Sequence, residues 1–128
     1  MTERITTDDA PRNDNPYSQA VRAGDTLYVS GYGPVDPTTG EEVAGDVGTQ
    51  TERVLGNVEH TVAAAGGSLA DLVKTTVYLT DLDDYDAMND AYGACLPSTP
   101  PARVCVEVSR LPGDVAVEMD AIAYLGEP

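Results

Sequence analysis

The sequence is poor in several residue types that mark common classes of protein. Its 128 residues include no Phe or Trp, one Lys (Lys74), one His (His60) and two Cys (Cys95 and Cys105). Two cysteines ten residues apart match neither a zinc site nor a Cys-x-x-Cys redox motif, and a single histidine without neighbouring ligands does not indicate a metal. Lys74 stands alone in a predicted strand with no cofactor motif near it, which gives a Schiff base little support. The sequence therefore predicts neither a metal nor a cofactor.

Basic residues are also scarce, seven against 22 acidic ones, so the formal net charge is −15. A surface of that sign repels nucleic acids and anionic membranes. The acidic residues are spread along the whole chain, which favours adaptation to a very salty cytoplasm over an acidic binding tail. We therefore expect a halophilic, acidic protein that has no nucleic-acid partner and loses stability at low salt through self-repulsion.

Long apolar runs are absent, and none approaches the ~20 residues needed to span a bilayer. Residues 1–15 are polar and contain three Asp, which is not the pattern of a secretory signal peptide. The cysteine usage is typical of a reducing compartment. We therefore expect a cytoplasmic protein without a membrane partner, and the chain length suits one domain, residues 1–128.

The apolar residues that are present follow both helix and strand periods. Residues 46–65 and 84–96 carry them at three- and four-residue steps, which predicts two amphipathic helices. Glycines end the first helix and prolines prevent continuation of the second. The predicted strands are residues 18–21, 26–30, 73–79, 101–108 and 115–124, with residues near Ile5 either pairing at an edge or staying loose. This order predicts an α+β domain with a mixed sheet and both helices packed on one face.

Two hairpins are expected, one joining the first two of these strands and one returning the last strand antiparallel to residues 101–108. Residues 101–108, Pro-Ala-Arg-Val-Cys-Val-Glu-Val, alternate polar and apolar side chains. Val104, Val106 and Val108 are expected to face the core. Arg103, Cys105 and Glu107 are then expected on the other face, where an arginine would lie beside a soft, weakly acidic thiol.

The motifs along the chain are Ser30-Gly31, Val-Lys-Thr-Thr-Val at 73–77, Met88-Asn89 with Tyr92, the segment 101–108, Arg110-Leu111-Pro112 and Val-Glu-Met-Asp-Ala-Ile-Ala at 117–123. Together they resemble the RidA (YjgF) family of reactive-intermediate deaminases, over about residues 5–124. The resemblance implies a chorismate-mutase-like α+β fold and a homotrimer with sites between subunits. It also implies hydrolysis of 2-imino acids or their enamines, released by pyridoxal-phosphate enzymes, to 2-oxo acids and ammonia without a metal or cofactor.

Site residues follow from the resemblance only where the motifs match. Arg103 matches the arginine that binds the substrate carboxylate, Cys105 a cysteine that lines the pocket, and Glu118 the acid placed near the water. Three more residues match substrate-binding positions of the family. Ser30 matches a hydroxyl at the pocket wall, Tyr17 an aromatic donated across the interface, and Asn89 an asparagine of the second helix.

Three positions depart from the family pattern. Asn15 stands where the family usually has Gly, Tyr32 where Gln is common, and Pro100 where an aromatic often precedes Pro-Ala-Arg. These departures are expected to reshape the pocket mouth and so to affect which substrate side chain is accepted.

The residue chemistry agrees with imine hydrolysis. A planar guanidinium binds a carboxylate through two hydrogen bonds, and a partly desolvated carboxylate such as Glu118 can exchange protons near neutral pH. Cys105 could act as a nucleophile, as a hydrogen-bond partner or only in packing. We favour shaping of the pocket over covalent catalysis, because no His is near it in the sequence to activate it.

Simpler interpretations of the same residues remain open. Arg103 could be a surface charge paired with Glu107, and Glu118 one more solvated acid. Tyr17 could anchor a core or an interface, while Ser30 and Asn89 could satisfy a turn or a loop. For the protein as a whole, the alternatives are a non-catalytic binder of small carboxylates, a chaperone-like protein or an RNA-directed one. The net charge disfavours the last, and no segment suggests the apolar patch that a chaperone needs.

Overall fold

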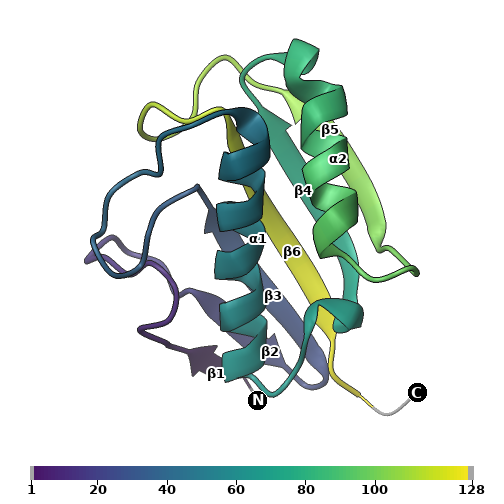
Figure 1. The fold of residues 1–128 in the computed structure, drawn as a ribbon. Coiled ribbons are helices and arrows are strands. Elements are labelled where there is room, and N and C mark those ends of the chain that lie inside the picture. The colour runs from purple at the N-terminus through teal and green to yellow at the C-terminus, as the bar shows by residue number, and fades with distance from the viewer. Residues whose placement is uncertain (1, 127–128) are drawn as a thin grey trace.

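The computed structural model describes residues 2–126 as one sheet covered on one side by two helices (Figure 1). The order of elements is β1 (Thr2–Ile5), β2 (Ala20–Ala23), β3 (Thr26–Tyr32), α1 (Val47–Ala64), β4 (Leu72–Leu79), α2 (Tyr85–Cys95), β5 (Ala102–Glu107) and β6 (Val117–Tyr124), with short 3-10 turns before β4 and α2. The predicted α+β class, the mixed sheet and the placement of the helices are confirmed.

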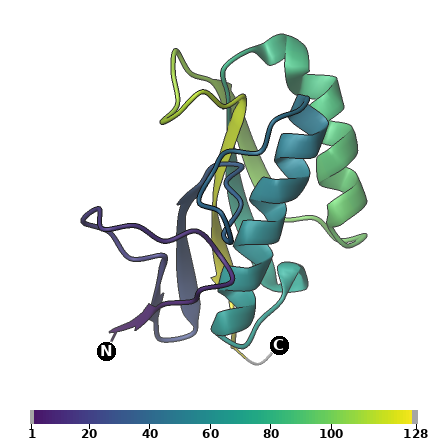
Figure 2. The same cartoon turned by 60° about the vertical axis from the view of Figure 1, so that its left-hand side comes forward.

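The six strands lie in the order β1-β2-β3-β6-β4-β5, and all neighbours are antiparallel except β4 and β5. Both helices pack on the same face, which is clearest when the sheet is seen nearly edge-on (Figure 2). The core lies between this face and the helices. No helix or strand of residues 2–126 covers the opposite face, which is called the open face below.

The last hairpin of the sequence-based prediction is wrong. β5 and β6 are not neighbours, because β4 lies between them, and β6 pairs with both β3 and β4. Alternate residues of β6 are fully or almost fully buried, which suits a central strand, whereas β5 follows two prolines and forms the sheet edge. The first hairpin, between β2 and β3, is confirmed, and β1 pairs at the other edge.

Helix α1 begins and ends as its sequence predicts. The Asp46 side chain accepts a hydrogen bond from Thr49 N at 2.9 Å, capping the first turn. One stripe of the helix (Val54, Leu55, Val58 and Val62) is at most 1% exposed, and burying each such side chain contributes about 1.5–3 kcal/mol. Gly66 has a φ of 91°, a value that glycine accepts readily, and it terminates the helix.

The two faces of β5 are the reverse of those predicted. Val104 and Val106 are 43% and 38% exposed on the open face, whereas Arg103 and Cys105 lie on the face covered by α2. The register shows this directly, since Arg103 is paired with buried Thr75 of β4. Hydrophobicity alone misplaced the valines, because the side chains of α2 provide partners for the arginine and the open face is itself partly apolar.

Candidate functional site

The predicted site residues form two groups on opposite faces of the sheet. Glu118, Tyr17 and Ser30 line one cavity, which is called the Glu118 pocket. Arg103 lies among side chains of α2 on the helix-covered face, and this group (Arg103, Tyr85, Met88 and Tyr92) is called the Arg103 cluster. The Glu118 pocket has a volume of about 580 Å³, and its wall is formed by residues from the segments 11–17, 30–42 and 112–118.

Glu118 projects from β6 on the open face, beside the irregular end of β3. The pairing of β3 with β6 shifts between Val29 and Tyr32. This irregularity brings Gly31 so close to Glu118 that a Cβ at position 31 would lie 2.7 Å from Glu118 Oε2. Partial burial, and secondarily the negative charge of Asp120, raise the pKa of the Glu118 carboxyl above its usual value of 4.5. Its ability to hold and release a proton is therefore shifted towards neutral pH.

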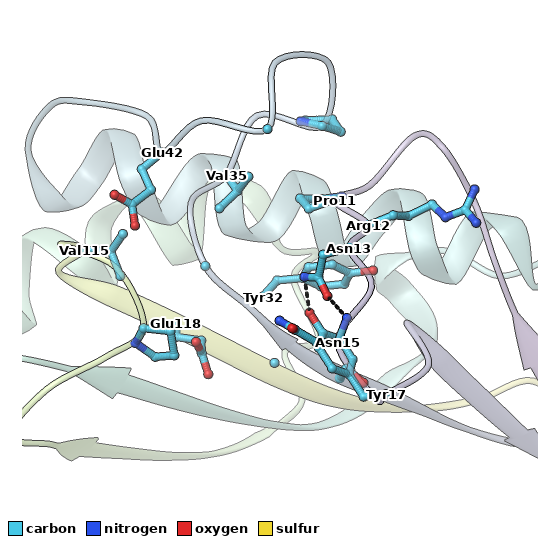
Figure 3. A pocket seen from close by; sticks show the side chains of 16 residues that line it. Pro11, Arg12, Asn13, Asn15, Tyr17, Tyr32, Val35, Glu42, Val115 and Glu118 are labelled. Atoms are coloured by element: carbon cyan, nitrogen blue, oxygen red, sulfur yellow. Dashed lines mark hydrogen bonds between the residues drawn. The ribbon is translucent and has the colours of Figure 1, made fainter.

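Tyr17 reaches the same cavity from the segment before β2 (Figure 3). Ser30 lines it from β3. The Tyr17 side chain is 56% exposed, and its hydroxyl accepts a hydrogen bond from Asn13 Nδ2 at 3.0 Å. The Ser30 hydroxyl donates to the carbonyl of Ser18 at 2.5 Å, so it can only accept a hydrogen bond from a ligand. Ser30 thus satisfies local backbone and still presents an acceptor to the pocket.

Three buried side-chain amides hold the walls of the Glu118 pocket. Gln19 accepts from Thr7 N at 2.8 Å and donates to the carbonyls of residues 7, 10 and 11. Asn57 of α1 donates to the carbonyls of Gly33 and Val35 at 3.2 and 2.9 Å. Gln50 donates to the Val43 carbonyl at 3.2 Å and accepts from Ala116 N at 2.9 Å. These bonds fix irregular segments that have no strand partners over most of their length.

Two of the family departures lie at this pocket. Asn15 lines it and belongs to the segment that carries Tyr17. Tyr32 also contributes to the lining, but its side chain is only 5% exposed and its hydroxyl is 2.6 Å from Thr61 Oγ1 of α1. Burial raises the pKa of Tyr32. Its position ties the start of the 33–42 segment to α1, and Pro100, the third departure, is exposed before β5.

The Arg103 cluster holds the guanidinium by three side chains of α2. Nη1 lies 3.8 Å from Met88 Sδ, and Nη2 donates to the Tyr85 hydroxyl at 3.2 Å. The guanidinium carbon is 5.6 Å from the ring centre of Tyr85 and 4.8 Å from that of Tyr92. Cation–π contacts of this kind orient the charge without neutralising it. One N–H on each terminal nitrogen and the Nε–H remain free for an anion.

The pairing of Arg103 with Glu107, one of the simpler interpretations, is excluded. Glu107 Oε1 instead accepts from the backbone N–H of Leu82 at 2.9 Å. Within residues 2–126, the ion pairs within 4.0 Å are Arg12–Asp8 and Arg22–Asp25, so Arg103 has no carboxylate partner there. The side chains of α2 hold the Arg103 guanidinium in place, and its positive charge remains available to bind an anion.

Cys105 and Asn89 lie on the two elements that form the Arg103 cluster, β5 and α2. Cys105 follows Arg103 on the same side of β5 and packs against the core. Burial raises the pKa of its thiol more than the nearby arginine lowers it, so the uncharged thiol is favoured and a nucleophilic role is not. Asn89 is half-buried on α2, four residues after Tyr85 and three before Tyr92, which places it on the same helix face.

A single chain does not bring the two groups together. Glu118 lies on β6 and Arg103 on β5, two strands apart, or ~10 Å at ordinary strand spacing, and they project from opposite faces. The α-carboxylate and the imine carbon of a 2-imino acid are adjacent atoms. One such molecule therefore does not reach both residues of the same chain.

Sequence reasoning missed the contribution of the helix to the Arg103 cluster. Tyr85, Met88 and Tyr92 were recognisable as one stripe of α2, but nothing local shows that β5 runs beside this helix. Gly31 was also recognisable only as part of a motif. Its close approach to Glu118 depends on the irregular pairing of β3 and β6.

No cluster of three or more potential metal ligands occurs in the described part of the chain. Between residues 2 and 126, neither helix combines the length and the apolar character needed to cross a bilayer.

Comparison with known proteins identifies relatives over almost the full length. Residues 7–125 match the sequence model of the family described as Endoribonuclease L-PSP. A RutC family protein of Pyrococcus horikoshii is 51% identical over 124 residues, which cover 97% of this chain and 98% of the relative. The 2-iminobutanoate/2-iminopropanoate deaminase of Escherichia coli K12 is 46% identical over 126 residues, 96% of this chain and 98% of the relative.

The solved structures agree with the fold. The crystal structure of E. coli TdcF with bound serine superimposes with a TM-score of 0.91 at 43% identity, covering 95% of this chain and 98% of that one. The chorismate-mutase-like fold expected from the motifs is thereby confirmed.

Proposed function

This chain belongs to the RidA/YjgF/RutC family, and on that premise we propose that it is a hydrolytic deaminase of 2-imino acids and their enamines. The substrates we infer are small ones of the 2-iminobutanoate and 2-iminopropanoate type, and the products are 2-oxo acids and ammonia. The observation that carries the proposal is the Arg103 cluster. It presents a guanidinium that two aromatic rings and two hydrogen bonds orient and that no carboxylate of the described chain neutralises.

We infer that the active unit is a homotrimer with sites between subunits. Two observations support this assembly. The Arg103 cluster and the Glu118 pocket lie on opposite faces of the sheet, so a complete site requires Arg103 of one copy and Glu118 of another. The open face also exposes large apolar side chains, among them Tyr28 at 50% and Val104 at 43%, which a second copy would cover.

In the proposed reaction Arg103 binds the substrate carboxylate through two of its free N–H groups. Glu118 accepts a proton from the water as the water oxygen bonds to the imine carbon. The substrate nitrogen enters protonated, so addition of the water oxygen gives a neutral carbinolamine and a protonated Glu118. Glu118 then donates its proton to the amine nitrogen, the C–N bond breaks and ammonia leaves. The hydroxyl on the former imine carbon gives its proton to the Glu118 carboxylate, which releases it to solvent, and the 2-oxo acid remains. The raised pKa of Glu118 suits a group that both takes and returns a proton near neutral pH.

The other site residues have supporting roles in this proposal. Ser30 accepts a hydrogen bond from the imine N–H, since its own proton is used by Ser18. Tyr17 and Asn89 contact the substrate from the two sides of the subunit interface. Cys105 packs beside the carboxylate site as a neutral thiol, and no step needs a metal or cofactor.

The charge of the protein disfavours the nuclease activity that the family description names. Seven basic residues are dispersed among 22 acidic ones, and an RNA backbone requires a basic surface for binding. A non-catalytic binder of small carboxylates would also use Arg103. However, it would gain nothing from an acid with a raised pKa at the pocket, because that acid repels anions when ionised.

The decisive experiment couples an amino-acid oxidase to semicarbazide in molar KCl. The oxidase produces 2-iminobutanoate from 2-aminobutanoate, and semicarbazide traps the imine that escapes hydrolysis. The wild-type protein should lower the semicarbazone signal, and Arg103→Ala should not. Arg4→Ala, which removes an exposed arginine from the opposite edge of the sheet, is the matched control and should behave as wild type.

If the folded wild-type protein leaves the semicarbazone signal unchanged but binds 2-oxobutanoate in calorimetry, the deaminase proposal is wrong and the binder takes its place. Loss of activity in both arginine variants would also contradict the assignment of Arg103. Sedimentation equilibrium of the wild type in the same salt tests the trimer.

A further inference from the structure

A second carboxylate lies beside Glu118 on the open face. Asp120 is two residues further along β6, so its side chain projects from the same face about 6–7 Å away. Tyr78 of β4 is paired with Glu118 in the register, and its hydroxyl donates to Asp120 Oδ2 at 3.0 Å. Tyr78 therefore reaches diagonally across the two strands and holds the Asp120 carboxylate at a fixed place.

We propose that Asp120, anchored by the Tyr78 hydroxyl, is a positioning residue that sets the pH at which Glu118 exchanges its proton. The inference rests on the proposed function, because it assigns a regulator to the same acid. A fixed negative charge at this distance disfavours a second negative charge, so Glu118 keeps its proton to higher pH than an isolated glutamate.

The remaining charges around Glu118 do not replace Asp120. In the proposed assembly Arg103 of a second copy also faces Glu118, and its positive charge acts in the opposite direction to that of Asp120. Several other titratable or charged side chains face the pocket or this part of the open face. They are Arg12 and Tyr17 of the N-terminal segment, Tyr28 and Tyr32 of β3, Lys74 and Tyr78 of β4, and Glu42 of the loop after β3. Arg12 is paired with Asp8 at 2.6 Å. Glu42 accepts from Asp114 N at 3.2 Å. Lys74 is paired in register with Ile122, beyond Asp120 as seen from Glu118.

The environment of Tyr78 suits its role as the hydrogen-bond donor that anchors Asp120. Burial and the neighbouring Asp120 and Glu118 raise the pKa of Tyr78, so its hydroxyl stays protonated and remains a donor throughout the neutral range. The donated bond holds one oxygen of the Asp120 side chain in place. The pair thus keeps the Asp120 carboxylate at a fixed position beside Glu118.

The test is a direct titration of Glu118 by carbon NMR of its side-chain carboxyl, in wild type and in Asp120→Asn, with Glu118→Gln used to assign the signal. The Glu118 midpoint should move to lower pH in Asp120→Asn and return towards the wild-type value in Asp120→Glu. Tyr78→Phe should shift the midpoint in the same direction by less, since an untethered Asp120 turns towards water. Glu59→Gln removes one charge from the helix layer and should leave the midpoint unchanged.

The pH dependence of kcat/KM, measured by the semicarbazide assay, should shift in the same direction as the NMR midpoint. An unchanged Glu118 midpoint in Asp120→Asn overturns the inference, even in an active enzyme. Conversely, a shifted midpoint in a protein without deaminase activity refutes the proposed function and leaves the electrostatic inference standing. An equal shift in Glu59→Gln would mean that net charge, not Asp120, sets the midpoint.

Discussion

The contact between Gly31 and Glu118 allows the position of the acid to be tested without changing the acid. In Gly31→Ala the new Cβ would lie 2.7 Å from Glu118 Oε2 and 3.3 Å from its Cδ. Gly31 does not have a positive φ, so the backbone accepts alanine. The atom that must move is the end of a flexible side chain, and the carboxylate is therefore expected to rotate away.

The substitution is expected to affect the stability of the protein far less than its reaction rate. Turning a side chain by ~30° from a preferred rotamer costs about 0.5–1.5 kcal/mol, so the free energy of unfolding should fall by no more than that. A misplacement of ~1 Å at a reacting group costs about 10²-fold in rate. We therefore expect Gly31→Ala to unfold nearly as wild type does and to lose most of its kcat.

Gly33→Ala is the matched control, since Gly33 lines the same pocket and a Cβ there meets nothing within 4 Å. Denaturant unfolding and the semicarbazide assay, both in molar KCl, provide the two readouts. Full activity of a folded Gly31→Ala protein would refute the reasoning, because it would mean that the placement of the Glu118 carboxylate does not matter. An equal loss in Gly33→Ala would attribute the effect to the pocket wall instead.

Four further substitutions test other parts of the site. Arg103→Lys should raise KM by roughly 10–100-fold in the deaminase assay, because an ammonium cannot form the bidentate pair; an unchanged KM would count against the carboxylate role. Cys105→Ala should keep kcat within a few-fold, since the thiol is uncharged, whereas complete loss would indicate a nucleophile. Tyr92→Phe removes the hydroxyl that lies 2.8 Å from buried Thr75 Oγ1 and should cost about 1–3 kcal/mol in urea unfolding. Glu118→Gln should unfold at a higher denaturant concentration than wild type at pH 7. The raised pKa of Glu118 stabilises the wild-type native state below about pH 4.5, and this contribution is lost as the pH rises through the native pKa. The difference between variant and wild type should therefore vanish below about pH 4.5.

The helices and the first hairpin could be predicted because their signals are local. The cap at Asp46, the apolar stripe of α1 and the glycine at position 66 all act within a few residues. The position of β6 could not be predicted in this way. A turn near Pro112 favours a hairpin with β5, but the buried side of β6 needs neighbours on both edges and takes β3 and β4 instead.

The candidate site shows the same limit. The motifs around Arg103 and Glu118 indicated both residues, but alternation along β5 assigned Arg103 to the wrong face. Whether a strand residue faces a helix depends on which helix lies over it, and the contacts of Arg103 with Tyr85 and Tyr92 join residues distant in the sequence. The separation of Arg103 from Glu118 likewise follows from strand order, which no local pattern encodes.

The buried amides of Gln19, Gln50 and Asn57 fix the backbone of the pocket walls independently of the side chains that line the pocket. Each amide binds main-chain atoms of the loop it supports and no loop side chain. Loop residues such as Asn15 and Val35 can therefore be exchanged while the walls stay in place. For engineering, this means that the side chains of the loops form a set of positions for diversifying substrate choice, provided the three amides are left untouched.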